Sequence, residues 1–238
     1  MSSKGKLNRF RENETFSCLI QPATEEVFGK DHPLKGRWNS DFFKNNNPIV
    51  LELGCGKGEY TIALSRKFPD KNFIGVDIKG ARLWRGAKFA EENSLSNVGF
   101  LRTRIEFLES IFGPDEISEI WITFADPQLK RDRKRLTGVM FLNRYKEFLK
   151  ENGVINLKTD SRFLHEYTLA LAKQNNLTIL EVNNDIYGSN YADEILSIKT
   201  FYESQFLEQG IDITYLKFCL DNSFPLKEPE WEKEKYSR

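Results

Sequence analysis

An apolar run that ends in three closely spaced glycines is the feature of this sequence that most restricts its fold. The run covers residues 49–53 and is followed by Gly54, Gly56 and Gly58. A continuously apolar strand is typical of a parallel sheet that is covered on both faces. In residues 58–68 the apolar positions then recur at helical spacing. This order predicts a strand–loop–helix unit whose loop turns sharply and lets a ligand approach the backbone closely.

The rest of the chain continues the alternation of strands and helices. We expect strands at 72–77, 97–102, 118–125, 153–158, 177–183 and 213–220, and helices at 79–93, 161–175, about 193–208, and after an N-cap at Thr137. Helices that alternate with strands predict an α/β fold with a mostly parallel, doubly wound sheet. A long insertion separates the last two strands, so we expect them to form an antiparallel edge. Residues 1–46 are expected to be irregular.

Composition narrows the class of protein. The 238 residues include 35 Lys+Arg and 35 Asp+Glu, so the formal net charge is zero, which argues against a protein that coats nucleic acid through bulk positive charge. The three cysteines and two histidines are scattered, so no metal site is expected. No apolar stretch reaches the roughly 18 residues that cross a bilayer. We therefore expect a cytoplasmic protein without membrane contact.

Acidic residues flank the glycine loop at two positions. Glu52 lies two residues before Gly54, and Asp77 ends the next predicted strand. The GxGxG spacing differs from the GxGxxG of dinucleotide-binding dehydrogenases. It is similar to the loop of Rossmann-like methyltransferases that bind S-adenosylmethionine, in which such acids hold the ammonium group and the ribose hydroxyls. In the alternative interpretation, the glycines only turn the chain, and Glu52 caps a helix or pairs with a lysine.

The fourth predicted strand ends at Asp126-Pro127 and is followed by a basic run. The cations of this run are Lys130, Arg131, Arg133, Lys134 and Arg135. Because parallel strands present ligand sites at their carboxyl ends, we expect Asp126 to face a ligand and the run to border it. Arg82 and Arg85, with Lys79 and Lys88 around Trp84, share a predicted helix face. Both groups can follow a phosphate backbone, although a solvated loop is the alternative for the basic run.

In their order along the chain, these motifs resemble the bacterial tRNA (guanine-N(7)-)-methyltransferase family, whose members have a Rossmann-like fold. The resemblance covers about residues 47–220 and is based on segments 51–60, 75–77, 124–130, 157–160 and 200–203. It implies an enzyme that transfers a methyl group from S-adenosylmethionine to N-7 of a guanine in the variable loop of tRNA, without a metal. From the sequence pattern itself we expect a partly flexible N-terminal arm at 1–46 and a C-terminal surface tail around Trp231 at 223–238, which leaves the methyltransferase catalytic domain at 47–222.

The resemblance implies a role for each matching residue. Asp126 is expected to be catalytic and to contact both cofactor and guanine. The other cofactor-binding residues are expected to be Glu52, Gly54, Gly56, Gly58, Asp77 and Thr103, and the substrate-binding residues Lys130, Asp160, Thr200 and Glu203. Gln128 and Leu129 depart from the family pattern, which usually has an aromatic residue followed by His or Pro. Thr103 stands where the family has an Asp near the adenine.

Other interpretations remain open at this point. Asp160 precedes a predicted helix and could be only its N-cap, and Thr200 and Glu203 could be ordinary residues of a helix. The chain could methylate another RNA base or a small molecule, or it could be a non-catalytic RNA-binding protein. We expect no stable protein partner, and either a monomer or a homodimer.

Overall fold

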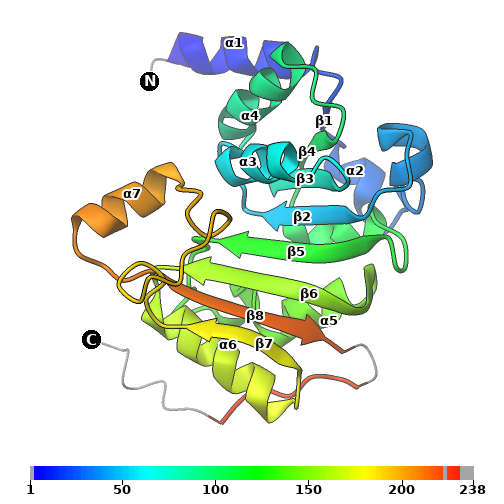
Figure 1. Ribbon diagram of the computed structural model, residues 1–238. Coiled ribbons are helices and arrows are strands. Elements are labelled where there is room, and N and C mark those ends of the chain that lie inside the picture. The colour runs from blue at the N-terminus through cyan, green and yellow to red at the C-terminus, as the bar shows by residue number, and fades with distance from the viewer. Residues whose placement is uncertain (1–2, 222–223, 231–238) are drawn as a thin grey trace. The chain divides into compact units, whose positions relative to one another are not determined.

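Helices and strands alternate along the chain in the computed structural model, which describes residues 3–221 and 224–230 (Figure 1). The chain divides into two compact units, Met1–Ile117 and Ser118–Arg238. Of the expected C-terminal tail at 223–238, residues 223 and 231–238 lie outside the described residues. The division at 46 and 222 remains a prediction.

The first unit is built around parallel strands. It contains α1 (Ser3–Asn13), β1 (Leu19–Ile20), α2 (Thr24–Val27), the π-helix η1 (Trp38–Phe43), β2 (Ile49–Leu53), α3 (Glu59–Lys67), β3 (Asn72–Asp77), α4 (Gly80–Glu92), β4 (Val98–Arg102) and the 3-10 helix η2 (Ile105–Ser110). The strands lie in the order β1-β4-β3-β2, and each neighbouring pair is parallel. All five residues of β2 are buried, as a parallel strand covered on both faces requires.

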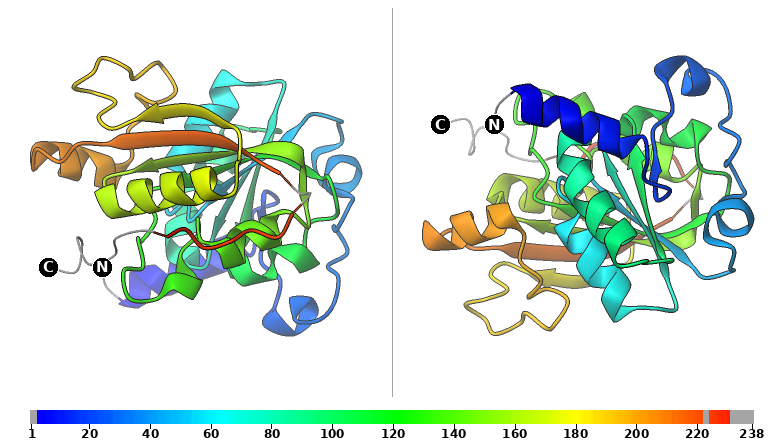
Figure 2. Two further views of the ribbon diagram at one scale, coloured as in Figure 1. Left: turned by 90° about the horizontal axis from the view of Figure 1, so that it is seen from below. Right: turned by 90° about the horizontal axis from the view of Figure 1, so that it is seen from above.

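The second unit carries the antiparallel edge. Its elements are β5 (Ile117–Thr123), the 3-10 helix η3 (Asp132–Lys134), α5 (Val139–Tyr145), β6 (Leu149–Thr159), α6 (Arg162–Gln174), β7 (Ile179–Asn183), α7 (Phe201–Glu208) and β8 (Thr214–Leu220). The strand order is β5-β6-β8-β7, and β8 is antiparallel to both β6 and β7. Helix α6 packs on β6 and β8 (Figure 2). The predicted antiparallel edge is therefore confirmed.

Three sequence-based expectations about local structure were wrong. Residues 1–46 are not irregular, because α1 forms there and packs along α4 (Figures 1 and 2). Thr137 does not cap α5, whose N-cap is Gly138; its hydroxyl instead lies 2.7 Å from that of Thr168 in the core. Helix α7 begins at Phe201 rather than near 193, because Thr200 supplies the N-cap.

Candidate functional site

The three glycines of the loop between β2 and α3 have different neighbours. Gly54, Gly56 and Gly58 all have a positive φ, of 76°, 58° and 73°, which residues with a side chain rarely adopt. A Cβ atom on Gly54 or Gly56 would have no heavy atom within 4 Å, whereas one on Gly58 would lie 2.5 Å from Cε1 of Phe100. Gly54 and Gly56 thus leave open backbone that a ligand can approach, and Gly58 makes room for a core ring.

The Glu52 carboxylate accepts hydrogen bonds from within the protein. The carboxylate is 3% exposed, and its Oε2 accepts hydrogen bonds from the Thr61 backbone N–H at 2.8 Å and the Thr61 hydroxyl at 2.5 Å. Thr61 is the third residue of α3, whose N-cap Gly58 has no side chain to satisfy these donors. The capping interpretation of Glu52 is therefore confirmed, and its contact with a cofactor remains a prediction.

Asp77 holds the loop from the end of β3. Its Oδ2 accepts a hydrogen bond from the Gly56 N–H at 3.0 Å, and its Oδ1 accepts one from the Lys79 N–H at 2.7 Å. Each carboxylate oxygen can accept a second bond, so the contacts leave capacity for ribose hydroxyls. Burial, with the charges of Glu52 and Asp77, raises the pKa of the Cys55 thiol well above its usual value. Cys55 is thus a protonated packing residue and not a nucleophile.

A pocket of about 320 Å³ lies beyond the carboxyl ends of β3 and β4. Ile78, Thr103, Arg104 and Phe107 line it together with residues of the 21–27 segment. Apolar side chains and a hydroxyl can receive an aromatic base. The open backbone at Gly54 and Gly56, the Asp77 carboxylate and this pocket are groups that can hold parts of a nucleoside cofactor.

In the second unit, Asp126 and Asp160 leave the same edge of the sheet. Strands β5 and β6 run in the same direction (Figure 1), and the Phe124 N–H donates to the Lys158 carbonyl at 2.9 Å. Asp126 lies two residues after Phe124, and Asp160 lies two residues after Lys158. Both aspartates therefore lie at the same edge of the sheet. The arrangement agrees with the expectation that the acids gather at the carboxyl ends of the strands.

The turn at Asp126 stores backbone strain. Phe124 and Gln128 both have a positive φ, of 51° and 52°, which costs about 1–2 kcal/mol for a residue with a side chain. The exposed Asp126 stabilises the turn, because its Oδ1 accepts a hydrogen bond from the Gln128 N–H at 2.9 Å. In the described part of the chain, Oδ2 of Asp126 accepts no hydrogen bond. Strained turns of this kind are typical of functional sites, and the structure leaves one carboxylate oxygen for a ligand.

Asp160 is not the N-cap of the helix that follows it. Ser161 is the N-cap of α6, and its hydroxyl accepts a hydrogen bond from the Leu164 N–H at 3.2 Å. Asp160 makes no ion pair with any residue that the structure describes, and burial raises the pKa of its carboxyl. The capping alternative was therefore wrong, and Asp160 is a half-buried acid at the edge of the sheet.

The basic run divides into exposed and buried members. Lys130, Arg131, Arg133 and Lys134 are exposed, and Lys130, Arg131 and Arg133 border a groove of about 620 Å³. Arg135 is only 1% exposed. The expectation that Arg135 belongs to an exposed, tRNA-contacting surface is contradicted by this burial.

Arg135 instead supports the Asp126 turn from inside the protein. Its Nε donates to the Pro127 carbonyl at 3.1 Å, and its Nη2 donates to the Gln128 carbonyl at 3.3 Å and to Asp132 at 2.9 Å. The guanidinium carbon lies 4.0 Å from the ring centre of Tyr167 and 4.8 Å from that of Phe163. A planar cation between rings and carbonyls is well suited to fix a strained loop.

The second group of cations is partly covered by α1. Arg85 is exposed on α4 and Arg82 is half-buried, but Arg9 of α1 stacks on Trp84 at 4.4 Å from the ring centre. The Trp84 indole N–H donates to Glu12, which also belongs to α1. Helix α1 thus covers part of the α4 face around Trp84 on which the cations were predicted to lie, so the accessible face is smaller than expected.

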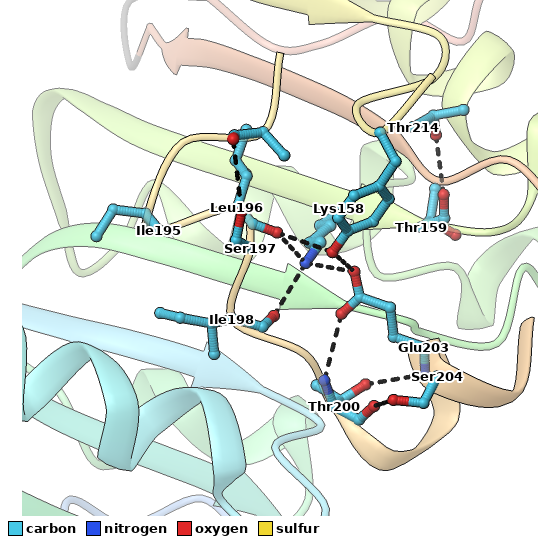
Figure 3. A network of polar contacts seen from close by, with 12 residues as sticks. Lys158, Thr159, Ile195, Leu196, Ser197, Ile198, Thr200, Glu203, Ser204 and Thr214 are labelled. Atoms are coloured by element: carbon cyan, nitrogen blue, oxygen red, sulfur yellow. Dashed lines mark hydrogen bonds and ion pairs between the residues drawn. The ribbon is translucent and has the colours of Figure 1, made fainter. Parts of the chain in front are cut away.

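Thr200 and Glu203 form a capping box at the start of α7. The Thr200 hydroxyl accepts from the Glu203 N–H at 3.2 Å, and the Glu203 carboxylate accepts from the Thr200 N–H at 3.3 Å. Glu203 is fully buried and forms an ion pair with Lys158 at 2.6 Å (Figure 3). Both residues therefore have structural partners, and their contact with a substrate remains a prediction.

Sequence patterns did not indicate the roles of Lys158 and Arg135. A lysine in the predicted buried strand 153–158 is a usable signal, because a cation in a buried strand needs an acidic partner. For Arg135 the sequence contains no such signal, since it is one of several neighbouring cations. The structure describes no group of three or more His, Cys, Asp or Glu side chains suited to a metal, and no helix long and apolar enough to cross a membrane.

Comparison with known structures confirms the fold class. A 16S rRNA methyltransferase, KamB, superimposes with a TM-score of 0.59 at 12% identity, over 76% of this chain and 92% of that one. A methyltransferase described as antibiotic-related gives a TM-score of 0.57 at 17% identity, over 80% of this chain and 96% of that one. At these identities the likeness shows the fold alone, which is the Rossmann-like methyltransferase fold.

Sequence comparison identifies the family. The family model described as a putative methyltransferase matches residues 46–216. A tRNA (guanine-N(7)-)-methyltransferase of Christiangramia forsetii is 57% identical over 92% of this chain and 99% of its own length. One of Bacteroides fragilis is 48% identical over 97% of this chain and 92% of its own length. Because these identities extend over nearly the full length of both chains, the chain belongs to the tRNA (guanine-N(7)-)-methyltransferase family.

Proposed function

We propose that this protein transfers a methyl group from S-adenosylmethionine to N-7 of a guanine in tRNA, in the variable loop. The observation that carries the proposal is the 57% identity over nearly the whole length to a relative named for this activity. The open backbone at Gly54 and Gly56 supports the same conclusion, because it leaves room for the cofactor.

The reaction requires orientation of the guanine more than it requires proton transfer. When bound, S-adenosylmethionine supplies an electrophilic methyl group on a sulfonium. Guanine N-7 has a free lone pair and carries no proton, so no general base is needed before attack. Asp126 and Asp160 can accept hydrogen bonds from the N-1 and N-2 hydrogens of the guanine. They would thereby orient N-7 and stabilise the positive charge that develops on the ring.

We assign the remaining roles by unit. Glu52, Asp77 and the glycine backbone hold the cofactor in the first unit, with Thr103 beside the adenine. Lys130 and its exposed basic neighbours contact tRNA phosphates in the second unit. Because the net charge of the chain is zero, the affinity for RNA depends on these local cations. This affinity should fall steeply as the salt concentration rises. A tRNA substrate also favours a cytoplasmic location.

The test is methylation of unmodified tRNA with labelled S-adenosylmethionine, followed by borohydride and aniline cleavage at the modified base. We expect label at N-7 of one guanine. Asp126→Asn should lose most turnover while its cofactor affinity stays measurable by calorimetry. Asp70→Asn, an exposed acid beyond α3, is the matched control and should remain active. Near wild-type turnover in Asp126→Asn would contradict the central role of this carboxylate.

The same assay separates the alternative functions. Label in a base amine would favour another RNA methyltransferase, and turnover without RNA would favour a small-molecule enzyme. Absence of cofactor binding in calorimetry would favour a non-catalytic RNA-binding protein.

A further inference from the structure

Lys158 is a fully buried cation in strand β6. It lies near the carboxyl end of β6, two residues before Asp160, and its side chain is fully buried. Its Nζ lies 2.6 Å from Oε1 of Glu203 and donates to the carbonyls of Leu196 at 2.6 Å and Ile198 at 3.1 Å (Figure 3). An ammonium group has three N–H donors, and the three acceptors use all of them.

The partners of Lys158 belong to two segments outside the sheet. Leu196 and Ile198 lie in the connection before α7, which has no regular secondary structure, and Glu203 lies in the first turn of α7. The Tyr187 hydroxyl donates to Glu203 at 2.7 Å and completes the network. One ammonium group therefore ties the connection and the start of α7 to the central strand β6.

The network reaches both aspartates of this unit. Asp160 follows Lys158 on the same strand. On the other side, Nζ lies 5.8 Å from the ring centre of Phe124, which begins the Asp126 turn and stacks on Phe206 of α7 at 6.0 Å. Whatever moves Lys158 will therefore disturb the segments that carry Asp126, Asp160 and Thr200.

Stability alone is a poor explanation for this ion pair. Burial lowers the pKa of Lys158, and the charge of Glu203 opposes the shift. Replacing a buried pair by apolar residues of similar volume is often neutral or stabilising, whereas removing one partner is strongly destabilising. A pair of this kind is well suited to fix a unique arrangement of the segments it joins.

We propose that Lys158 is a positioning residue for the methyl transfer, which holds the connection 193–200 and the start of α7 in register with Asp126 and Asp160. It contacts neither guanine nor cofactor. The proposal depends on the function proposed above, since the guanine is what the positioned groups would receive.

The test uses Lys158→Met and the double variant Lys158→Met/Glu203→Gln. The single variant leaves a buried carboxylate unpaired and should lower Tm. The double variant removes that charge and should recover part of the lost Tm, but it still lacks the bonds to Leu196 and Ile198. We expect kcat for tRNA to fall on the order of 10- to 100-fold in both variants, as expected for misplaced groups. Cofactor affinity should change by no more than about twofold.

Lys217→Met is the matched control. Lys217 on β8 forms an ion pair with Glu181 at 2.8 Å in the same unit, but neither residue contacts the network. We expect this variant to keep kcat within about twofold of wild type. Hydrogen exchange of the amides at 193–203 should accelerate in both Lys158 variants and not in Lys217→Met.

The outcomes distinguish failure of the positioning role of Lys158 from failure of the proposed function. A double variant that recovers kcat together with Tm would overturn the positioning role and show a structural one. Unchanged exchange at 193–203 would overturn it as well. If the wild-type protein does not methylate tRNA, the proposed function fails and this assignment fails with it. An active wild type with an equally active Lys158→Met refutes only the assignment.

Discussion

Replacing Gly58 by alanine should destabilise the protein through two separate effects. The backbone φ of 73° costs a residue with a side chain about 1–2 kcal/mol. The new Cβ would lie 2.5 Å from Cε1 of Phe100, which is fully buried and cannot move into solvent. Overpacking of this kind costs about 1–3 kcal/mol. The sum is about 2–5 kcal/mol, which corresponds to a fall in Tm of roughly 4–20 °C for a chain of this size.

Gly56→Ala is the matched control within the same loop. Its φ of 58° carries the same backbone penalty, but no heavy atom lies within 4 Å of the new Cβ. We expect a loss of only about 1–2 kcal/mol. The methyl group instead enters the space assigned to the cofactor, so S-adenosylmethionine affinity should fall about tenfold or more.

Thermal unfolding and calorimetry measure the two effects. A double-mutant cycle with Phe100→Leu tests the cause directly, because a smaller side chain at 100 relieves the contact with Ala at 58. Phe100→Leu should therefore be less destabilising in the Gly58→Ala background than in wild type. Equal Tm losses in Gly58→Ala and Gly56→Ala, or an absence of coupling to position 100, would refute the reasoning.

Three further predictions follow from buried groups. Arg135→Met should lower the free energy of unfolding by about 1–3 kcal/mol and reduce methylation, because the carbonyls of Pro127 and Gln128 lose their hydrogen-bond donor. Arg133→Met should leave Tm unchanged and lower only tRNA affinity, and the reverse order would contradict the assignment. Burial, reinforced by the charge of Arg162, lowers the pKa of His165 to about 4. The unfolded chain then binds the extra proton, so the free energy of unfolding should fall by up to about 3 kcal/mol as the pH drops from about 6.5 to 4. In urea titrations, His165→Phe should remove this slope, and an unchanged slope would contradict it. Because burial raises its pKa, Cys55 should react with iodoacetamide at pH 8 more slowly than the half-buried Cys219; equal rates by mass spectrometry would refute this.

Local patterns predicted most of the regular elements within a few residues. Strands β2 and β3 and helices α3 and α4 lie close to their expected ranges, because apolar runs and helical periodicity are properties of short segments. The largest error concerns α1, which has no apolar stripe and leaves Leu7 61% exposed. Its partners are on α4: the Asn13 side-chain amide donates to the Gly80 carbonyl at 2.9 Å, and Arg9 covers Trp84. Such contacts between distant segments leave no periodic signal in the sequence.

The features of the candidate site likewise divide into those that the sequence predicted and those that only the tertiary structure decided. The sequence by itself determined the fold class, the glycine loop and the placement of Asp126 and Asp160 at the ends of strands, since residue type and spacing are enough for these. Only the tertiary structure decided that Glu52 caps α3, that Ser161 rather than Asp160 caps α6, and that Arg135 is buried while its neighbours are exposed. The physical reason is that hydrogen-bond partners and burial depend on which distant segments meet. Arg135 is buried because Tyr167 and Phe163 of α6 lie beside it, and nothing in the run of cations around it specifies that contact.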